Sequence, residues 1–390
     1  MKNHSSEYTE SILLIILGNL ASFGPFVTDF YLPCLPELAV YFSSPASVVQ
    51  MSLTAGMIGL AAGQLIIGPV ADKYGRRAPL LWCLSFFIIA SVGCILSPGI
   101  YWFVFFRLLQ GLTGSCGLVV SKAMVADRYS GRELGRFFAI LTAIQFISPI
   151  LAPVLGGVTF SLTSWKGIFI VLVVWSAVLL YASSRLKETL EKDKRLRLPI
   201  RKSFLAFLPV LRNRKYMEMN LFQAFVSTVF FSYISASPFI FQNRFGLSPL
   251  NYGLCFAGNA AGLILGSLFV LKLKEQRSVL LPGTTGLLAT CGLTSLALLL
   301  DWPFGIFEAA LFSMIFFCGM LIPVGNTLAL DYESDNKGTA AALLGAVSFL
   351  SGGLAAPLAG IGDMIRSTVV LFMTSASISL IICVYTRKNN

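Results

Sequence analysis

The chain has 390 residues, of which 56% are hydrophobic and 12% charged, and its mean hydropathy is +0.79. A soluble domain carries roughly 25% charged residues, so no water-soluble fold hides this much apolar surface. The formal net charge of +11 raises the question of a polyanionic partner, which the positions of the basic residues decide.

The apolar residues gather in twelve runs long enough to cross a bilayer. Bilayer hydrocarbon is about 30 Å thick, so a spanning helix needs roughly 20 residues. The first run lacks a small-residue cleavage site, so we expect it to remain as a span rather than be removed as a signal peptide. The predicted spans are residues 11–33, 47–71, 78–97, 100–123, 137–160, 167–184, 219–241, 252–271, 279–300, 304–330, 339–362 and 368–385.

The basic residues predict how these spans are oriented. With a cytoplasmic amino terminus, only Lys166, Arg244 and Arg366 lie on the outer side, Arg107 lies within a span, and all other Lys and Arg residues lie inside. This distribution follows the positive-inside rule, so the charge needs no nucleic acid partner. We therefore expect a multi-pass protein of the bacterial inner membrane with both termini in the cytoplasm.

The cysteines and the histidine form no pattern typical of a metal site or an enzyme. The eight cysteines are spread singly through apolar runs, without a C-x-x-C pair. The one histidine, His4, lies in the polar amino-terminal tail. Without an intramembrane histidine, paired acids or a cysteine cluster, we expect no metal, no cofactor and no enzymatic activity.

The sequence repeats itself at half its length. Residues 135–157 align with residues 338–360, and ten of these 23 positions are identical. Such a repeat predicts two six-helix halves of like orientation, and hence an all-α membrane fold. We expect an amino-terminal bundle in residues 1–184, a basic cytoplasmic linker in residues 185–216 and a carboxy-terminal bundle in residues 217–390.

The segment GPVADKYGRRAPLL, between the second and third spans, combines glycines with charges. Gly75 permits a tight turn, and Gly68 precedes it. Asp72 is expected to pair with a neighbouring positive group or helix terminus and so to latch the inner side. The alternative is that Arg76 and Arg77 serve only as positive anchors at the membrane surface.

Two charged residues lie well inside predicted spans, away from their ends. A charge such as that of Arg107 costs from ~2.5 kcal/mol upward within a bilayer unless it is paired, hydrated or extended to the interface. Asp29 is the one acid well inside a span, because Glu308 is placed at the outer rim of the tenth. A buried carboxylate must pair with a cation or take up a proton, and Arg107 is the expected partner.

The fifth span contains SPILAPVLGG, which joins prolines to glycines. Pro149 and Pro153 lie four residues apart on one helix face, and each removes a backbone hydrogen bond. Gly156 and Gly157 are expected to let a neighbouring helix pack closely.

Together these features resemble the major facilitator superfamily. The loop motif is similar to the superfamily's signature loop, and SPILAPVLGG is similar to the motif that marks its antiporters. VTDFYLPCLP in the first span and SYISASPF in the seventh resemble the bicyclomycin-resistance (Bcr/CflA) branch of drug:proton antiporters. The resemblance implies that certain polar residues face a central cavity, namely Tyr31, Gln110, Gln145, Tyr233 and Asn326.

The hypothesis that follows is proton-coupled export by a monomer. Burial favours the protonated form of a carboxyl group, whereas a neighbouring guanidinium favours the ionised form. Asp29 would therefore exchange a proton for an amphipathic substrate, and a single membrane acid favours one proton per cycle. The alternatives are a permanent structural bridge to Arg107, an exporter dedicated to one metabolite or siderophore, and a proton-coupled uptake permease.

Overall fold

The computed structural model describes residues 4–196, 205, 207–273, 275–333 and 336–388, and all regular elements in these ranges are helical. The helices of the first half are α1 (His4–Ala21), α2 (Phe23–Asp29), α3 (Leu35–Tyr41), α4 (Ala46–Tyr74), α5 (Arg77–Ile95), α6 (Ile100–Arg128), α7 (Gly131–Leu162) and α8 (Trp165–Ser184). Those of the second half are α10 (Phe207–Arg212), α11 (Arg214–Phe239), α12 (Pro249–Leu271), α13 (Leu280–Leu299), α14 (Phe304–Asp331), α15 (Lys337–Ala359) and α16 (Met364–Lys388).

Twelve helical segments within the described ranges are long and apolar enough to cross a membrane, which confirms the predicted number. The first span is longer than predicted, because it runs from Ile12 to Tyr41 rather than ending at residue 33. Pro33 and Pro36 do not end it, since each lies in the first turn of a short helix, where its missing N–H is not needed.

The junction between the halves also differs from the prediction. The short helix α10 is followed directly by α11, which begins at Arg214 instead of residue 219. Asn213 caps α11, because its side chain accepts a hydrogen bond from the backbone N–H of Tyr216. The predicted linker, residues 185–216, thus contains helix at its end, while residues 197–204 and 206 lie outside the described part.

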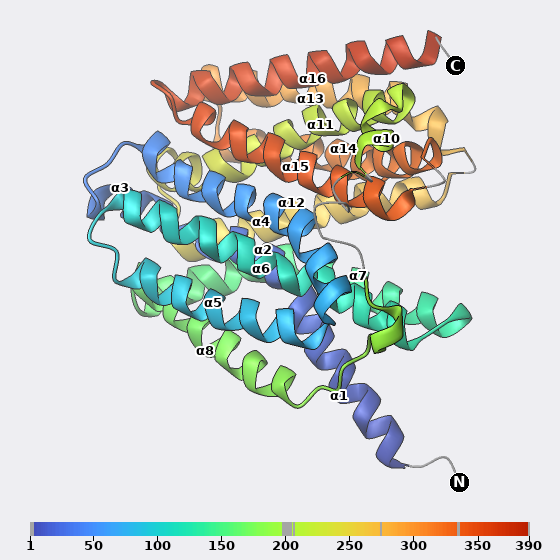
Figure 1. Cartoon of the computed structure of the whole chain (residues 1–390). Coiled ribbons are helices and arrows are strands. Elements are labelled where there is room, and N and C mark those ends of the chain that lie inside the picture. The colour runs from blue at the N-terminus through green and yellow to red at the C-terminus, as the bar shows by residue number, and fades with distance from the viewer. Residues whose placement is uncertain (1–3, 197–204, 206, 274, 334–335, 389–390) are drawn as a thin grey trace.

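The helices form two groups (Figure 1). Helices α1 to α8 occupy the lower part of the view and α11 to α16 the upper part, and linker residues 185–196, which follow α8, lie at one end of the molecule. We call this end the linker face. Helix α4 packs against α15, and α7 packs against α12, so these four helices join the two groups.

The two groups are tied together at the face opposite the linker. The Gln242 side chain donates a hydrogen bond of 2.9 Å to the Pro33 carbonyl oxygen. The Gln50 side chain donates another of 2.9 Å to the Ser235 carbonyl oxygen. Because both bonds cross between the halves, they close the bundle at this face.

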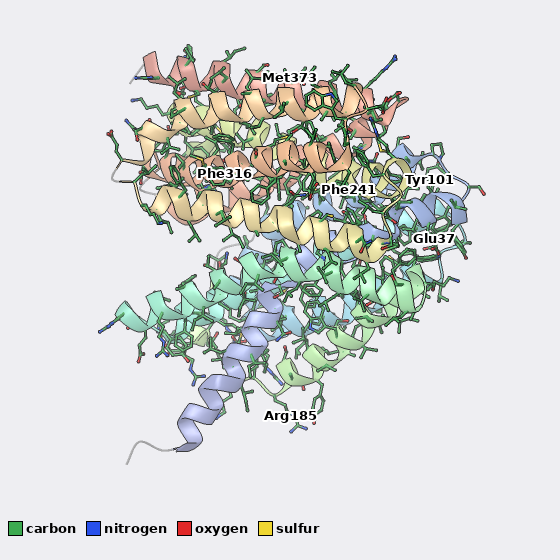
Figure 2. The ribbon with its side chains drawn as sticks, turned by 180° about the vertical axis from the view of Figure 1, so that it is seen from behind. Glu37, Tyr101, Arg185, Phe241, Phe316 and Met373 are labelled. Atoms are coloured by element: carbon green, nitrogen blue, oxygen red, sulfur yellow. The ribbon has the colours of Figure 1, made fainter. Side chains whose placement is uncertain are left out.

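Apolar side chains cover the outside of the bundle. Figure 2 shows Glu37 and Tyr101 at the end away from the amino terminus, among many side chains that project outward. Tyr101 is 73% exposed and Trp82 is 66% exposed, and many other large hydrophobic side chains are exposed as well. A surface with this many exposed apolar side chains is typical of a protein that faces lipid. The surface therefore agrees with a protein whose solvent is the bilayer.

Candidate substrate and proton site

A cavity of 1040 Å³ lies between the two halves at the linker face, and we call it the entry cavity. Gln145 of α7 lines it, as predicted. The cavity is also lined by Asp72 near the end of α4, Gly338 at the start of α15 and Leu196 of the linker. These three positions place the mouth of the cavity at the linker face. Its size suits a drug-sized molecule, since ligand pockets range over about 300–1,000 Å³.

A smaller chamber of 150 Å³ lies deeper, and we call it the deep chamber. Gly24, Pro25 and Phe349 line both spaces, so the deep chamber adjoins the entry cavity. The other side chains of its wall are mostly aromatic or aliphatic, together with Asp29 and Tyr233. The deep chamber is therefore an apolar space with one carboxyl group and one phenol.

Asp29 is the last residue of α2 and is 5% exposed. Its polar neighbour is the Thr28 side chain, whose hydroxyl donates to the Gly24 carbonyl oxygen at 3.2 Å. No Lys or Arg side chain forms an ion pair with Asp29 in the described part of the chain. The carboxyl group thus faces the deep chamber without a counter-charge.

The predicted pairing of Asp29 with Arg107 is wrong for this conformation. The Arg107 guanidinium donates instead to the Gln110 side chain and, at 2.5 Å, to the Val27 carbonyl oxygen. The Val27 side chain faces Gly114 of α6. Asp29 follows Val27 by two residues, which is about 200° around a helix, so it faces away from α6 and its arginine.

Tyr31 and Gln110 also lie elsewhere than predicted. The guanidinium of Arg107 lies over the Tyr31 ring at 4.0 Å, and the Tyr31 hydroxyl is 3.2 Å from the Ser52 hydroxyl. The Gln110 side chain donates to the Ser91 hydroxyl at 2.7 Å. These side chains contact the buried arginine and do not line the cavity. The prediction was wrong because the superfamily resemblance indicates which helix borders the cavity but not which face of that helix does.

Of the three remaining residues that we predicted to face the cavity, two line one of these spaces and one does not. Tyr233 lines the deep chamber and Gln145 lines the entry cavity, as expected of cavity residues, while their contact with substrate stays a prediction. Asn326 is half-buried on α14 and lines neither space, which corrects the third prediction. The chamber wall also contains aromatic residues that the sequence did not single out, such as Phe231 and Phe256.

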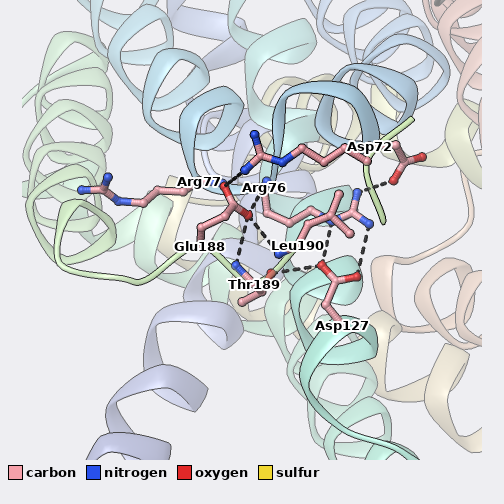
Figure 3. Close-up of polar contacts among 8 residues, drawn as sticks. Asp72, Arg76, Arg77, Asp127, Glu188, Thr189 and Leu190 are labelled. Atoms are coloured by element: carbon pink, nitrogen blue, oxygen red, sulfur yellow. Dashed lines mark hydrogen bonds and ion pairs between the residues drawn. The ribbon is translucent and has the colours of Figure 1, made fainter. Parts of the chain in front are cut away.

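Figure 3 shows the polar network around the α4–α5 loop. The Arg76 guanidinium bridges Asp72 and Asp127, with 2.9 Å from its Nε to the Asp127 Oδ2. This confirms that Asp72 pairs with a positive group. The Arg77 guanidinium donates to the Ser184 carbonyl oxygen at 2.6 Å, so neither arginine is only a membrane anchor.

The linker joins this network through Glu188, which the sequence did not single out. Its carboxylate accepts backbone N–H bonds from Arg76 at 2.8 Å and from Arg77 at 3.2 Å. Gly75 has φ of +93°, and a Cβ atom there would collide with that carboxylate, so the turn requires glycine. Gly68, by contrast, has room for a Cβ, with only Val119 at 4.0 Å.

The contacts of Glu188 also set its charge state. Partial burial raises the pKa of this carboxyl group, but the backbone N–H groups of Arg76, Leu190, Arg77 and Thr189 lower it by more. The pKa of Glu188 therefore lies below its usual range. Three acids lie near the start of the linker, namely Glu188, Glu191 and Asp193, and the sequence does not indicate which of them meets the loop.

The proline and glycine motif of α7 meets two different neighbours. A Cβ on Gly156 would collide with the Phe30 carbonyl oxygen, just beyond α2. A Cβ on Gly157 would lie 2.7 Å from the Pro249 carbonyl oxygen, at the start of α12. The predicted close approach is thus confirmed. Pro149 lines the deep chamber, and Pro153 is the neighbour of a glycine on α12.

A bundle of twelve spans with a cavity between its halves has the architecture of a membrane transporter for small molecules. The family comparison agrees. The model described as Major Facilitator Superfamily matches residues 14–356, so the chain belongs to that superfamily and is a transporter, not an enzyme.

Similar proteins cover nearly the whole chain. The uncharacterized MFS-type transporter YdgK of Bacillus subtilis is 37% identical over 377 residues, 94% of each chain. A bicyclomycin resistance protein homolog of Haemophilus influenzae is 27% identical over 96% of this chain and 95% of its own, which confirms the expected branch resemblance. The crystal structure of a bacterial homolog of the human lysosomal transporter Spinster has the same fold, with a TM-score of 0.71 at 16% identity and coverage of 99% of this chain and 96% of that one.

Proposed function

We propose that this protein exports amphipathic small molecules across the bacterial inner membrane in exchange for protons, as a monomer. The observation that carries the proposal is the position of Asp29, a buried and unpaired carboxyl group in an aromatic chamber that adjoins the entry cavity. The name of the bicyclomycin resistance relative supports export of drugs. The basic linker supports a cytoplasmic linker face and cytoplasmic termini.

The proposed cycle begins with substrate entering from the cytoplasm. Asp72 and Lys122 both line the entry cavity, so its charges do not select substrates of one sign. The deep chamber then selects apolar and aromatic groups through rings such as Phe230 and Phe231. Residues 1–184 and 217–390 act as the two bodies that move, joined by the linker.

Asp29 links the substrate to the proton in this scheme. The ionised carboxylate holds the substrate, since a polar or cationic group compensates its charge. When the outer side opens, a proton binds the carboxylate, the charge disappears and the substrate leaves. The proton then departs to the cytoplasm when the inner side opens, which completes an exchange of one for the other.

The membrane gradient supplies enough free energy for this exchange. A single charge that moves through 100 mV yields ~2.3 kcal/mol, and each pH unit adds ~1.4 kcal/mol. Export against a substantial concentration ratio therefore needs no nucleotide and no cofactor.

The test compares Asp29→Asn with the parent in inside-out vesicles that generate a proton gradient. We expect the parent to take up ethidium or chloramphenicol, and Asp29→Asn to fall to the level of vesicles without the protein. Glu37→Gln is the matched control, because Glu37 is exposed on α3 and lies outside both spaces. Undiminished proton-driven uptake by Asp29→Asn would end the proposal.

The same vesicles separate the alternative functions. An uptake permease would move its substrate in the opposite direction, with the proton rather than against it. An exporter dedicated to one metabolite would leave bacterial tolerance to bicyclomycin and chloramphenicol unchanged on expression, although Asp29 remained necessary for proton movement.

A further inference from the structure

Glu308 lies deeper than its position in the sequence indicates. It is the fifth residue of α14, yet its side chain accepts a hydrogen bond of 3.0 Å from Asn259, near the middle of α12. The Glu308 side chain therefore reaches inward between the helices and does not stay at the rim, which corrects the sequence prediction. Its second oxygen, Oε2, is buried and has no hydrogen-bond partner.

One buried oxygen of Glu308, its Oε2, lacks a partner. The residues beside it are Asn259, which is 1% exposed, and Tyr233, which is 3% exposed and forms a side-chain hydrogen bond with Asn259. Tyr233 also lies within electrostatic range of Glu308. Buried polar atoms in folded proteins are nearly always satisfied, so the unpartnered Oε2 points to a proton or a cation at this atom.

No positive side chain neutralises Glu308. Helix α11 presents Tyr233 to it, and α12 presents Cys255 as well as Asn259. Helix α13 carries no charged residue along its length, and α15 carries none from residue 338 to 359. Of the arginines on this face, Arg244 is already bonded to Asp301 and to the Leu298 carbonyl oxygen, and Arg366 is exposed in the first turn of α16. An ionised carboxylate in this position is uncompensated.

Two phenols connect Glu308 to the chamber that holds Asp29. Tyr233 lines the deep chamber and also borders Glu308. Tyr252 lies within electrostatic range of Asp29 and of Tyr233, and its hydroxyl is 3.1 Å from that of Ser237. Glu308, Asn259 and the two phenols therefore form a buried polar group within the carboxy-terminal half, and Tyr233 brings this group to the wall of the chamber that holds Asp29.

We propose that Glu308 is a second proton-carrying carboxyl group, so that two protons are exchanged for each substrate. This inference rests on the proposed antiport through Asp29 for its role in transport. The proton binds Oε2 of Glu308 as an O–H bond and is released from the same atom, with no change in any other bond. Asn259 binds the carboxyl group, and Tyr233 lies between it and the deep chamber. Substrate that enters the chamber therefore changes the surroundings of Glu308.

Protonation of Glu308 is measured without any substrate. Infrared spectra of the purified full-length protein in lipid report protonated carboxyl groups, and are recorded across a pH series. We expect Glu308→Gln to remove one titrating component and Asp29→Asn to remove another. The control Glu218→Gln, which alters only a surface ion pair with Arg214, leaves both components. Identical spectra for Glu308→Gln and the parent would overturn the proposal.

The same spectra distinguish a proton from a metal cation. Replacing choline with Na⁺ at constant pH leaves the Glu308 component unchanged if a proton is the ligand. A component that disappears on addition of Na⁺ overturns the assignment in favour of a sodium site. If Glu308→Gln fails to fold, Asn259→Leu replaces it, and the pH midpoint of the Glu308 component must then move.

The stoichiometry follows from the limiting gradient in proteoliposomes. With one pH unit across the membrane and no potential, each exchanged proton contributes a factor of about ten, so two protons support about 100-fold accumulation of chloramphenicol. We expect Glu308→Gln to reduce this limit to about tenfold. A parent limit of tenfold overturns the proposal. If the parent shows no exchange at all, the antiport proposal fails, while the infrared result still decides whether Glu308 titrates.

Discussion

Arg107 is completely buried, and the structure assigns it a different role from the one its position in a span predicts. Its guanidinium donates to Gln110 and to the Val27 carbonyl oxygen, and it covers the Tyr31 ring. The arginine therefore fixes α2 against α6 and leaves Asp29 free. In the proposed cycle, this separation leaves the carboxyl group available to substrate and proton.

Replacement of Arg107 tests this role. We expect Arg107→Ala to lower the free energy of unfolding, because each buried group left without its partner costs about 1–3 kcal/mol. Thermal unfolding in detergent measures the change. Arg107→Lys keeps the charge but not the forked geometry, so it should restore only part of the stability. Full stability of Arg107→Ala would contradict the role.

The sequence identifies Asp29 and Arg107 as charged residues inside spans, but it does not show whether their side chains are in contact. Spans, motifs and the burial of Asp29 follow from residue type and position along the chain. The partner of a side chain depends on helix rotation, as Val27 and Asp29 show, and one sequence does not give that rotation. For the same reason Glu308 was placed at the rim, although its contact with Asn259 lies deeper.

At the scale of helices, α7 and α12 approach each other through glycine. Gly157 meets the Pro249 carbonyl oxygen at 2.7 Å, and Gly253 meets the Pro153 carbonyl oxygen at 2.6 Å, each measured from an added Cβ. The two helices belong to different halves, so their backbones touch at the boundary between the halves. The SPILAPVLGG motif in α7 therefore correctly predicted that a neighbouring helix packs closely at its glycines.

Gly157→Ala tests the approach of these helices. Because its Cβ meets backbone that must shift, we expect a loss of about 1–3 kcal/mol in the free energy of unfolding and slower transport. Gly258→Ala is the matched control on α12, since nothing lies within 4 Å of its Cβ. Alanine there should stabilise the helix by roughly 0.5–1 kcal/mol. Equal effects at both positions would argue against close packing at Gly157.

The start of the linker behaves as a pH-dependent element. Docking lowers the pKa of Glu188, so its contribution to docking is complete above about pH 4.3, the usual value for Glu, and is lost as the pH falls through the lower docked value. A spin label at Lys192→Cys, an exposed position, should become mobile as the pH falls below 4.3.

Glu188→Gln provides the comparison. The neutral amide accepts the backbone N–H groups less strongly, so the label should already be mobile at neutral pH. A label that is equally immobile in both proteins, at every pH, would show that Glu188 does not hold the linker. The pairing of Glu188 was outside sequence reasoning, because it joins residues 112 positions apart.

At the scale of the whole molecule, the described conformation is open at the linker face and closed at the other. Thr339 lines the entry cavity, whereas Leu300 is exposed on the opposite face. A membrane-impermeant maleimide should therefore label Thr339→Cys only from the cytoplasm and Leu300→Cys only from outside. Labelling of Thr339→Cys from outside alone would reverse the proposed orientation.

The bonds that close the face opposite the linker have an uneven composition. Gln50 and Gln242 supply the donors, while both acceptors are main-chain carbonyl oxygens, of Ser235 and Pro33. A carbonyl oxygen is present whatever amino acid occupies its position, so genetic drift at the two acceptor positions leaves both bonds in place. Substitution of either glutamine removes a bond directly, so selection for leaky or altered variants should converge on these two codons.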